Sequence, residues 1–212
     1  MEKFITPKIK ICGLTKPKEA EYLNQGEVDF AGFVFYEKSK RNVDFKKAEE
    51  IGKKLSTKIK KVAVAVSPSV DFARAAVQAG FDVLQVHGEL MPEILELGIP
   101  IWRAVNITDK TRLETVFLQE KNESENLLGY VLDGAGYGGG KPFDWQGMAE
   151  QVKKITAGKS LILAGGLTVE NVQKGIRYFS PDVVDVSSGV EEEYGKSREK
   201  ILEFAAQVRK NK

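Results

Sequence analysis

The sequence contains only one cysteine and one histidine among its 212 residues, and this scarcity excludes several classes of protein. A single cysteine cannot form an intramolecular disulfide, so a disulfide-stapled fold is excluded. One cysteine and one histidine are also too few for a typical structural zinc site, and the chain has no HExxH, CxxC or GxxxxGK[ST] motif. We therefore expect no metal ion in this protein.

Long apolar runs and an excess of one charge are missing as well. The apolar runs have the length of strands, not the roughly 20 residues that cross a membrane, and residues 1–7 lack an apolar stretch of signal-peptide length. The 32 Lys and Arg nearly balance the 30 Asp and Glu, which leaves a formal net charge of +2. We expect a cytoplasmic protein that binds a small molecule and neither a membrane nor nucleic acid.

Short apolar runs that alternate with helical patterns are abundant. With 42% hydrophobic residues the chain can bury a full core, in one large domain or two small ones. Runs typical of strands cover residues 8–11, 29–35, 61–66, 83–86, 101–105, 127–132, 160–164 and 183–187. Patterns typical of helices cover residues 19–25, 44–55, 69–78, 91–97, 109–119, a segment from Trp145, and residues 168–177 and 197–209.

Eight consecutive strand–helix units define the predicted fold. The strands are too continuously apolar to have a solvated face, so they are expected to be parallel and covered by helices. Eight units in one chain predict an α/β protein with a single (β/α)₈ TIM barrel, one domain spanning residues 1–212. An open doubly wound sheet is the alternative at this stage, because strand counts from sequence are error-prone.

Polar residues at the ends of the predicted strands are the candidates for function, because the reactive groups of such barrels lie at the C-terminal ends of their strands. The candidates in these positions are Cys12, Ser39, Arg41, Gln85, His87, Arg103, Asp133, Gly165, Gly166, Ser187, Ser188 and Gly189.

Glycines after the last two strands indicate a phosphate site. Gly165 and Gly166 follow the seventh strand, and Ser188 and Gly189 follow the eighth, so both segments expose backbone amides where these barrels commonly bind phosphate. Either segment alone is equally well explained as a tight turn.

Cys12, Asp133 and His87 each have a functional and a structural interpretation. A lone cysteine is more often a small buried hydrophobe, although Cys12 ends a strand at a glycine, where a thiol can act as a base or nucleophile. Asp133 precedes a glycine-rich segment at residues 134–140 that could close over a ligand, but a strand-end Asp can equally form a turn. For His87, a hydrogen-bonded polar group under a loop is favoured over a catalytic role.

Several motifs, spread in order over nearly the whole chain, carry a resemblance to a known family. They are KICGLT (10–15), GFVF (32–35) with SKR (39–41), QVHG (85–88), LD (132–133), FDW (143–145), AGGL (164–167) with ENV (170–172), and DVSSGVE (185–191). Together they resemble the phosphoribosylanthranilate isomerases, and KICG with DVSSGVE is a specific pair. The family reaction is an Amadori rearrangement in tryptophan biosynthesis that needs no cofactor.

The resemblance implies roles for individual residues. Asp133 matches the family's general acid, Cys12 its general base, and Arg41 the arginine that holds the anthranilate carboxylate. The implied substrate-binding residues are Arg41, Gly165, Gly166, Asp185, Ser188 and Gly189, with a monomer or a homodimer as the assembly.

Two departures from the family pattern affect these expectations. Residues 137–142 are shorter than the usual segment and lack its hydroxyl residue, and Arg103 stands where a lysine is common. A barrel enzyme acting on another phosphorylated sugar, or a non-catalytic phosphate-binding barrel, are the alternatives that the sequence leaves open.

Overall fold

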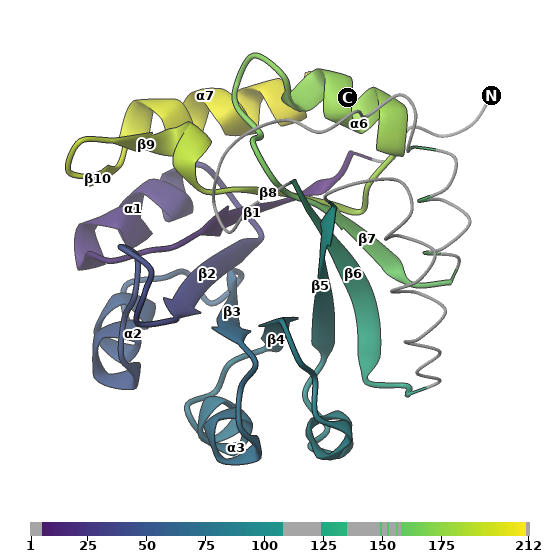
Figure 1. Ribbon diagram of the computed structural model, residues 1–212. Coiled ribbons are helices and arrows are strands. Elements are labelled where there is room, and N and C mark those ends of the chain that lie inside the picture. Colours follow the sequence, from purple (N-terminus) through teal and green to yellow (C-terminus); the bar gives the residue numbers. More distant parts are fainter. Residues whose placement is uncertain are drawn as a thin grey trace.

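The computed structural model describes residues 6–107, 124–134 and 158–210, together with residues 149, 152 and 156. Within these residues, parallel strands form a closed barrel in chain order, and β1 completes the ring by pairing with β8 (Figure 1). The strands are β1 (Lys8–Cys12), β2 (Phe30–Phe35), β3 (Lys60–Val66), β4 (Val83–His87), β5 (Ile101–Ile107), β6 (Leu127–Gly134), β7 (Ser160–Leu163) and β8 (Val183–Val186). The closed ring confirms the predicted (β/α)₈ barrel and excludes the open sheet.

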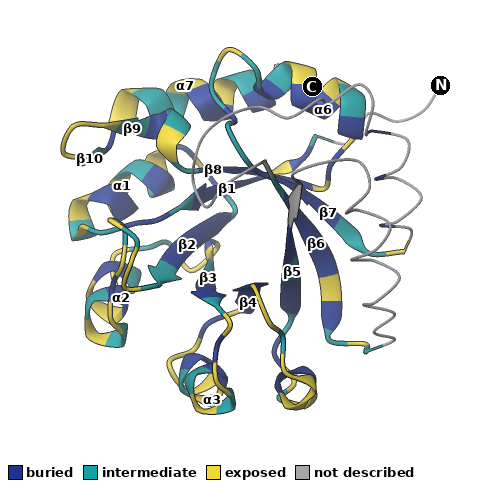
Figure 2. Cartoon of the chain, viewed as in Figure 1, coloured by how far each residue is buried: buried dark blue, intermediate teal, exposed yellow. Residues whose placement is uncertain are grey.

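Side chains alternate between two cores along each strand, because successive residues of a strand point to opposite faces. One core fills the barrel, where Phe30 and Trp102 meet edge to face with 4.9 Å between ring centroids. The other core lies between strands and helices and contains Ile9 and Ile11 of β1. Both faces of the strands are therefore buried, which explains their continuous apolar runs (Figure 2).

The helices lie outside the ring of strands (Figure 1). In the described parts of the chain they are α1 (Pro17–Gln25), α2 (Phe45–Gly52), α3 (Val70–Gln78), α6 (Val172–Phe179) and α7 (Arg198–Val208), with the 3₁₀ helices η1 (Pro92–Glu96) and η2 (Ser188–Val190). Asp44 and Ser69 cap α2 and α3, because their side chains accept backbone hydrogen bonds from Lys47 and Phe72. In the part of the chain that the structure describes, no helix has the length and apolarity to cross a membrane.

Three helix predictions were wrong in detail. The short helix predicted at residues 91–97 is the 3₁₀ helix η1, because its turns close between residues three apart. Helix α2 ends at Gly52, since tight turns follow it, and Leu55 still packs against the core from beyond the helix. Helix α6 begins at Val172, four residues later than predicted, because residues 168–171 form a turn held by the Asn171 side chain.

Two further predictions cannot be compared, because the helix expected at residues 109–119 and the start of the helix expected near Trp145 lie outside the described residues. The elements between β8 and α7 were not predicted. After β8 and η2, the short antiparallel strands β9 (Glu191–Glu192) and β10 (Gly195–Lys196) form a hairpin beside α1 (Figure 1). This hairpin carries charged residues to the C-terminal end of the barrel.

Candidate active site

A cavity of about 480 Å³ opens at the C-terminal ends of the strands. Its lining brings together most of the residues predicted from sequence: Cys12, Ser39, Arg41, Gln85, His87, Asp133, Gly165, Gly166, Asp185, Ser187 and Ser188. Two of the described candidates, Arg103 and Gly189, do not line it. The position of the cavity is the one expected for the active site of a (β/α)₈ barrel.

Cys12 is the last residue of β1 and points into the cavity wall next to Gly32 of β2. A Cβ on Gly32 would lie 2.9 Å from the Cys12 sulfur, so the glycine leaves space for the thiol. Burial raises the pKa of the Cys12 thiol above its ordinary value, although the positive charges of Lys10 and Lys196 act in the opposite direction. Lys10 and Lys196, both buried, are therefore cations that favour the Cys12 thiolate.

Asp133 lies within β6, one residue before its end. Burial raises the pKa of Asp133 to about 7, the negative charge of Asp185 adds to this rise, and Lys10 opposes it. Desolvation therefore favours the protonated form of this carboxyl. The glycine-rich segment expected to close over a ligand, residues 134–140, lies outside the described residues except for Gly134.

A buried ion pair influences the pKa values of both Cys12 and Asp133. Lys10 of β1 and Asp185 of β8 point into the barrel, and Lys10 Nζ lies 2.6 Å from Asp185 Oδ2. Among the described residues, the other Asp185 oxygen, Oδ1, has no hydrogen-bond partner, and Asp185 lines the cavity. One carboxylate oxygen thus holds Lys10, while the other is buried without a described hydrogen-bond donor.

Lys10 is a site residue to which the sequence analysis assigned no role. A signal for it exists in the strand pattern, because Lys10 and Cys12 share one face and Ile9 and Ile11 share the other. In a strand that is buried on both faces, a lysine within the apolar run requires an anionic partner. The sequence alone did not indicate which of the 30 acidic residues that partner is.

The loops after β7 and β8 form the glycine-rich side of the cavity. Gly165 and Gly166 have φ angles of 79° and 71°, a region that favours glycine. The Asn171 side chain donates to the Gly166 carbonyl oxygen at 2.8 Å and accepts from the Thr168 amide at 2.8 Å, which fastens this loop to the start of α6. Gly189 does not line the cavity but packs closely against the loop after β7, since a Cβ there would overlap the Leu167 carbonyl oxygen.

His87 ends β4 and is buried beside Gln85, with 2.9 Å between His87 Nε2 and the Gln85 side-chain nitrogen. Burial lowers the pKa of His87 to about 4, and Lys10 and Arg103 act in the same direction, so the imidazole is neutral at pH 7. Arg103 itself donates to the Val86 carbonyl oxygen at 3.2 Å. Among the described residues, no three His, Cys, Asp or Glu side chains are grouped so as to hold a metal ion.

Fold and site together define a (β/α)₈-barrel protein whose cavity combines a thiol, a carboxyl with a pKa near neutrality, and the glycine-containing loops after β7 and β8. Comparison with known proteins narrows this class. Residues 9–207 match the family described as N-(5'phosphoribosyl)anthranilate (PRA) isomerase, so the chain belongs to that family.

Individual relatives are similar to this chain over nearly their full lengths. The N-(5'-phosphoribosyl)anthranilate isomerase of Clostridium acetobutylicum is 39% identical over 209 residues, which cover 97% of this chain and 99% of the relative. The enzyme of the same description from Acetivibrio thermocellus is 38% identical over 214 residues, 95% of each chain. The crystal structure of phosphoribosyl anthranilate isomerase from Thermotoga maritima superposes with a TM-score of 0.83, at 29% identity over 96% of this chain and 98% of that one.

Proposed function

We propose that this protein converts N-(5'-phosphoribosyl)anthranilate to 1-(2-carboxyphenylamino)-1-deoxyribulose 5-phosphate, an Amadori rearrangement in tryptophan biosynthesis. The observation that carries the proposal is that Cys12 and Asp133 line one cavity, where burial gives Asp133 a pKa of about 7. A solved phosphoribosyl anthranilate isomerase with 28% identity and a TM-score of 0.81 is in complex with reduced 1-(o-carboxyphenylamino)-1-deoxyribulose 5-phosphate. That ligand supports the assignment of the same chemistry to this chain.

The reaction moves protons and needs no redox partner, so we propose that it proceeds without a cofactor or metal. Asp133, as general acid, donates its proton to the ribose ring oxygen while the ring opens to a Schiff base. Cys12, as the thiolate, then removes the proton from the adjacent sugar carbon, and the electron pair forms the enolamine. Tautomerisation of the enolamine gives the 1-amino-2-ketose product.

The remaining residues hold the substrate in this proposal. Arg41 pairs with the anthranilate carboxylate, since a guanidinium presents several donors in one plane. The second Asp185 oxygen, Oδ1, accepts from a sugar hydroxyl. Backbone amides of the loops at Gly165, Gly166 and Ser188 bind the phosphate, and Gly189 acts through the packing of the two loops.

We further propose a single catalytic domain over residues 1–212, located in the cytoplasm, that binds no nucleic acid and acts as a monomer or homodimer. The nearly balanced charge supports a small-molecule ligand over nucleic acid. A Thermotoga maritima relative is described as a dimeric enzyme from which monomers were generated, so either state is compatible with this fold.

Turnover of N-(5'-phosphoribosyl)anthranilate tests the proposal, with loss of anthranilate-type fluorescence as the readout. A barrel enzyme for another phosphorylated sugar would leave this substrate unchanged. A non-catalytic binding barrel would bind the reduced product analogue without turnover, and Cys12→Ala would then change no measurable property.

Arg41→Ala is expected to weaken binding of ligands that carry the aryl carboxylate by about 1.5–3 kcal/mol, because one charge-assisted contact is lost. The measurement is the dissociation constant of the reduced product analogue, compared with that of a phenylamino analogue without the carboxylate. Equal losses for the two ligands would contradict the role of Arg41.

Gly166→Val is expected to raise KM by about tenfold or more, the cost of losing a hydrogen bond to a charged phosphate. The valine side chain would crowd the phosphate, and it would be strained at the Gly166 φ of 71°. Gly98→Val is the matched control, because Gly98 has a φ of 72° and no described atom lies within 4 Å of a Cβ added there. Normal affinity of Gly166→Val for the product analogue would place the phosphate elsewhere.

A further inference from the structure

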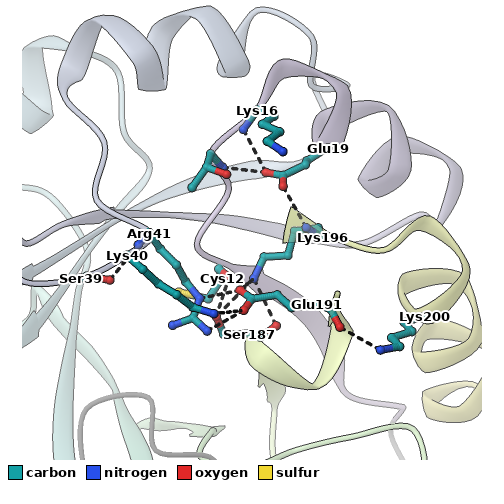
Figure 3. Close-up of polar contacts among 11 residues, drawn as sticks. Cys12, Lys16, Glu19, Ser39, Lys40, Arg41, Ser187, Glu191, Lys196 and Lys200 are labelled. Carbon is teal, nitrogen blue, oxygen red and sulfur yellow. Dashed lines mark hydrogen bonds and ion pairs between the residues drawn. The ribbon is translucent and has the colours of Figure 1, made fainter. Parts of the chain in front are cut away.

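Glu191, the first residue of β9, binds three cations from two segments of the chain. Its carboxylate accepts from Arg41 Nε at 2.5 Å and from Arg41 Nη2 at 2.8 Å. Lys196 Nζ donates to the same carboxylate at 2.7 Å, and Lys40 Nζ lies 3.1 Å from it. Figure 3 shows the Glu191 carboxylate between Arg41 and Lys196, beside Cys12. None of the roles derived above uses this glutamate.

We propose that Glu191 is a positioning residue that fixes the Arg41 guanidinium for recognition of the substrate's aryl carboxylate. A guanidinium has a side edge, formed by Nε and one terminal nitrogen, and an end edge, formed by the two terminal nitrogens. Glu191 occupies the side edge of Arg41. No contact between described residues occupies the end edge, which can pair with a second carboxylate through two parallel hydrogen bonds.

The glutamate is itself held by buried groups. The Lys196 side chain is fully buried, and its Nζ also donates to the carbonyl oxygen of Ser187 at 3.2 Å. The Lys196 amide donates to Glu19 Oε1 at 2.9 Å, and Glu19 Oε2 accepts from the amides of Thr15 and Lys16 at the start of α1. The orientation of Glu191 is therefore set by the loops after β1 and β8, and it is passed on to Arg41 in the loop after β2.

Arg41 is restrained along its whole length. Its amide donates to the Ser39 side chain at 3.1 Å, and its aliphatic stem lies against Gly13, where an added Cβ would overlap Arg41 Cδ. The side chains of Arg41 and Glu191 are only 14% and 11% exposed, whereas that of Lys40 is 73% exposed. The exposed Lys40 therefore contributes little to holding Glu191, and the Arg41–Glu191 contact determines the orientation of the guanidinium.

Two substitutions separate position from charge. Glu191→Asp keeps the charge but withdraws the carboxylate by one methylene, so both oxygens can no longer reach the side edge of Arg41. Glu191→Gln keeps the length but removes the charge and one acceptor. Positioning predicts that both variants bind the reduced product analogue roughly tenfold more weakly, the effect of about one charge-assisted hydrogen bond.

The inference rests on the proposed function, and the experiment keeps the two apart. We would measure KM, kcat and the dissociation constants of the product analogue with and without its carboxylate. The proteins compared are wild type, both Glu191 variants and the control Glu192→Gln on the same hairpin. The expected result is a higher KM, a nearly unchanged kcat and a loss confined to the ligand with the carboxylate. In an Arg41→Ala background, changing Glu191 should cause no further loss.

Three outcomes would overturn the inference alone. Tighter binding by Glu191→Gln together with wild-type binding by Glu191→Asp would show that Glu191 only screens the charge of Arg41. Equal losses for both ligands, with a lowered melting temperature, would show a purely structural ion pair. An undiminished loss in the Arg41→Ala background would show that Glu191 acts through another group. If wild type failed to turn over N-(5'-phosphoribosyl)anthranilate, the proposed function would fall first.

Discussion

Asp133→Asn and Cys12→Ala are each expected to lower kcat by about 10²–10⁴, the usual contribution of one positioned acid or base. Asparagine keeps the shape of Asp133 but cannot donate the proton that opens the ribose ring, and alanine removes the base. Cys12→Ser should be nearly as slow, because a hydroxyl supplies almost no anion near neutral pH. Affinity for the reduced product analogue should survive in all three variants.

The dependence of kcat/KM on pH gives this prediction a second readout. The Asp133 pKa of about 7 lies below the raised pKa of the Cys12 thiol. Between these two pKa values, Asp133 and Cys12 together hold one proton, and it resides mainly on Cys12. The reactive form, in which the proton is on Asp133 and Cys12 is ionised, is therefore the minor one. Accordingly, kcat/KM should rise with pH to about 7 and fall only above the pKa of Cys12. In Asp133→Asn, the residual activity should rise with ionisation of Cys12 and should not fall again.

The measurements are kcat, the pH profile and the dissociation constant of the product analogue for each variant. Asp71→Asn serves as the control, because its side chain is 92% exposed on α3. Intact turnover in any of the three active-site variants would refute the role assigned to that residue, while loss of ligand binding would point to a disrupted structure.

Lys10→Met is expected to lower the free energy of unfolding by about 3–5 kcal/mol, the usual cost of removing one partner of a buried ion pair. The exposed fractions of the Lys10 and Asp185 side chains are 0% and 6%, so the remaining carboxylate would lack both its counter-ion and bulk solvent. Methionine has nearly the length of lysine, which limits the contribution of a cavity. Urea unfolding measures the loss.

The double variant Lys10→Met with Asp185→Leu is the matched control. Replacing both members of a buried pair by apolar side chains is often neutral or stabilising, so the double variant should recover most of the stability of the wild type. It should still be a poor enzyme, because Lys10 favours the Cys12 thiolate and Asp185 helps to keep Asp133 protonated. A loss below about 1 kcal/mol in Lys10→Met would show that Asp185 does not depend on Lys10.

The sequence predicted the strands well and the helix ends less well, for a physical reason. A strand buried on both faces has an apolar run that ends where the strand ends, as at Cys12 and Val66. The ends of helices depend on which backbone groups form hydrogen bonds with side chains or turns instead of with the helix. Asn171 holds the turn before α6, and the apolar spacing toward Leu55 continues past the end of α2.

The sequence by itself determined the alternation of strands and helices, and with it the barrel and the strand-end positions of Cys12 and Asp133. These are local properties of spacing, apolarity and turn residues. Only the tertiary structure decided which charges meet. Lys10 pairs with Asp185 across 175 positions of the chain and Arg41 with Glu191 across 150, and burial raises the pKa of Asp133 to about 7. Coulomb attraction and desolvation depend on distance through space and on exclusion of water, and neither quantity is written in the order of residues along the chain.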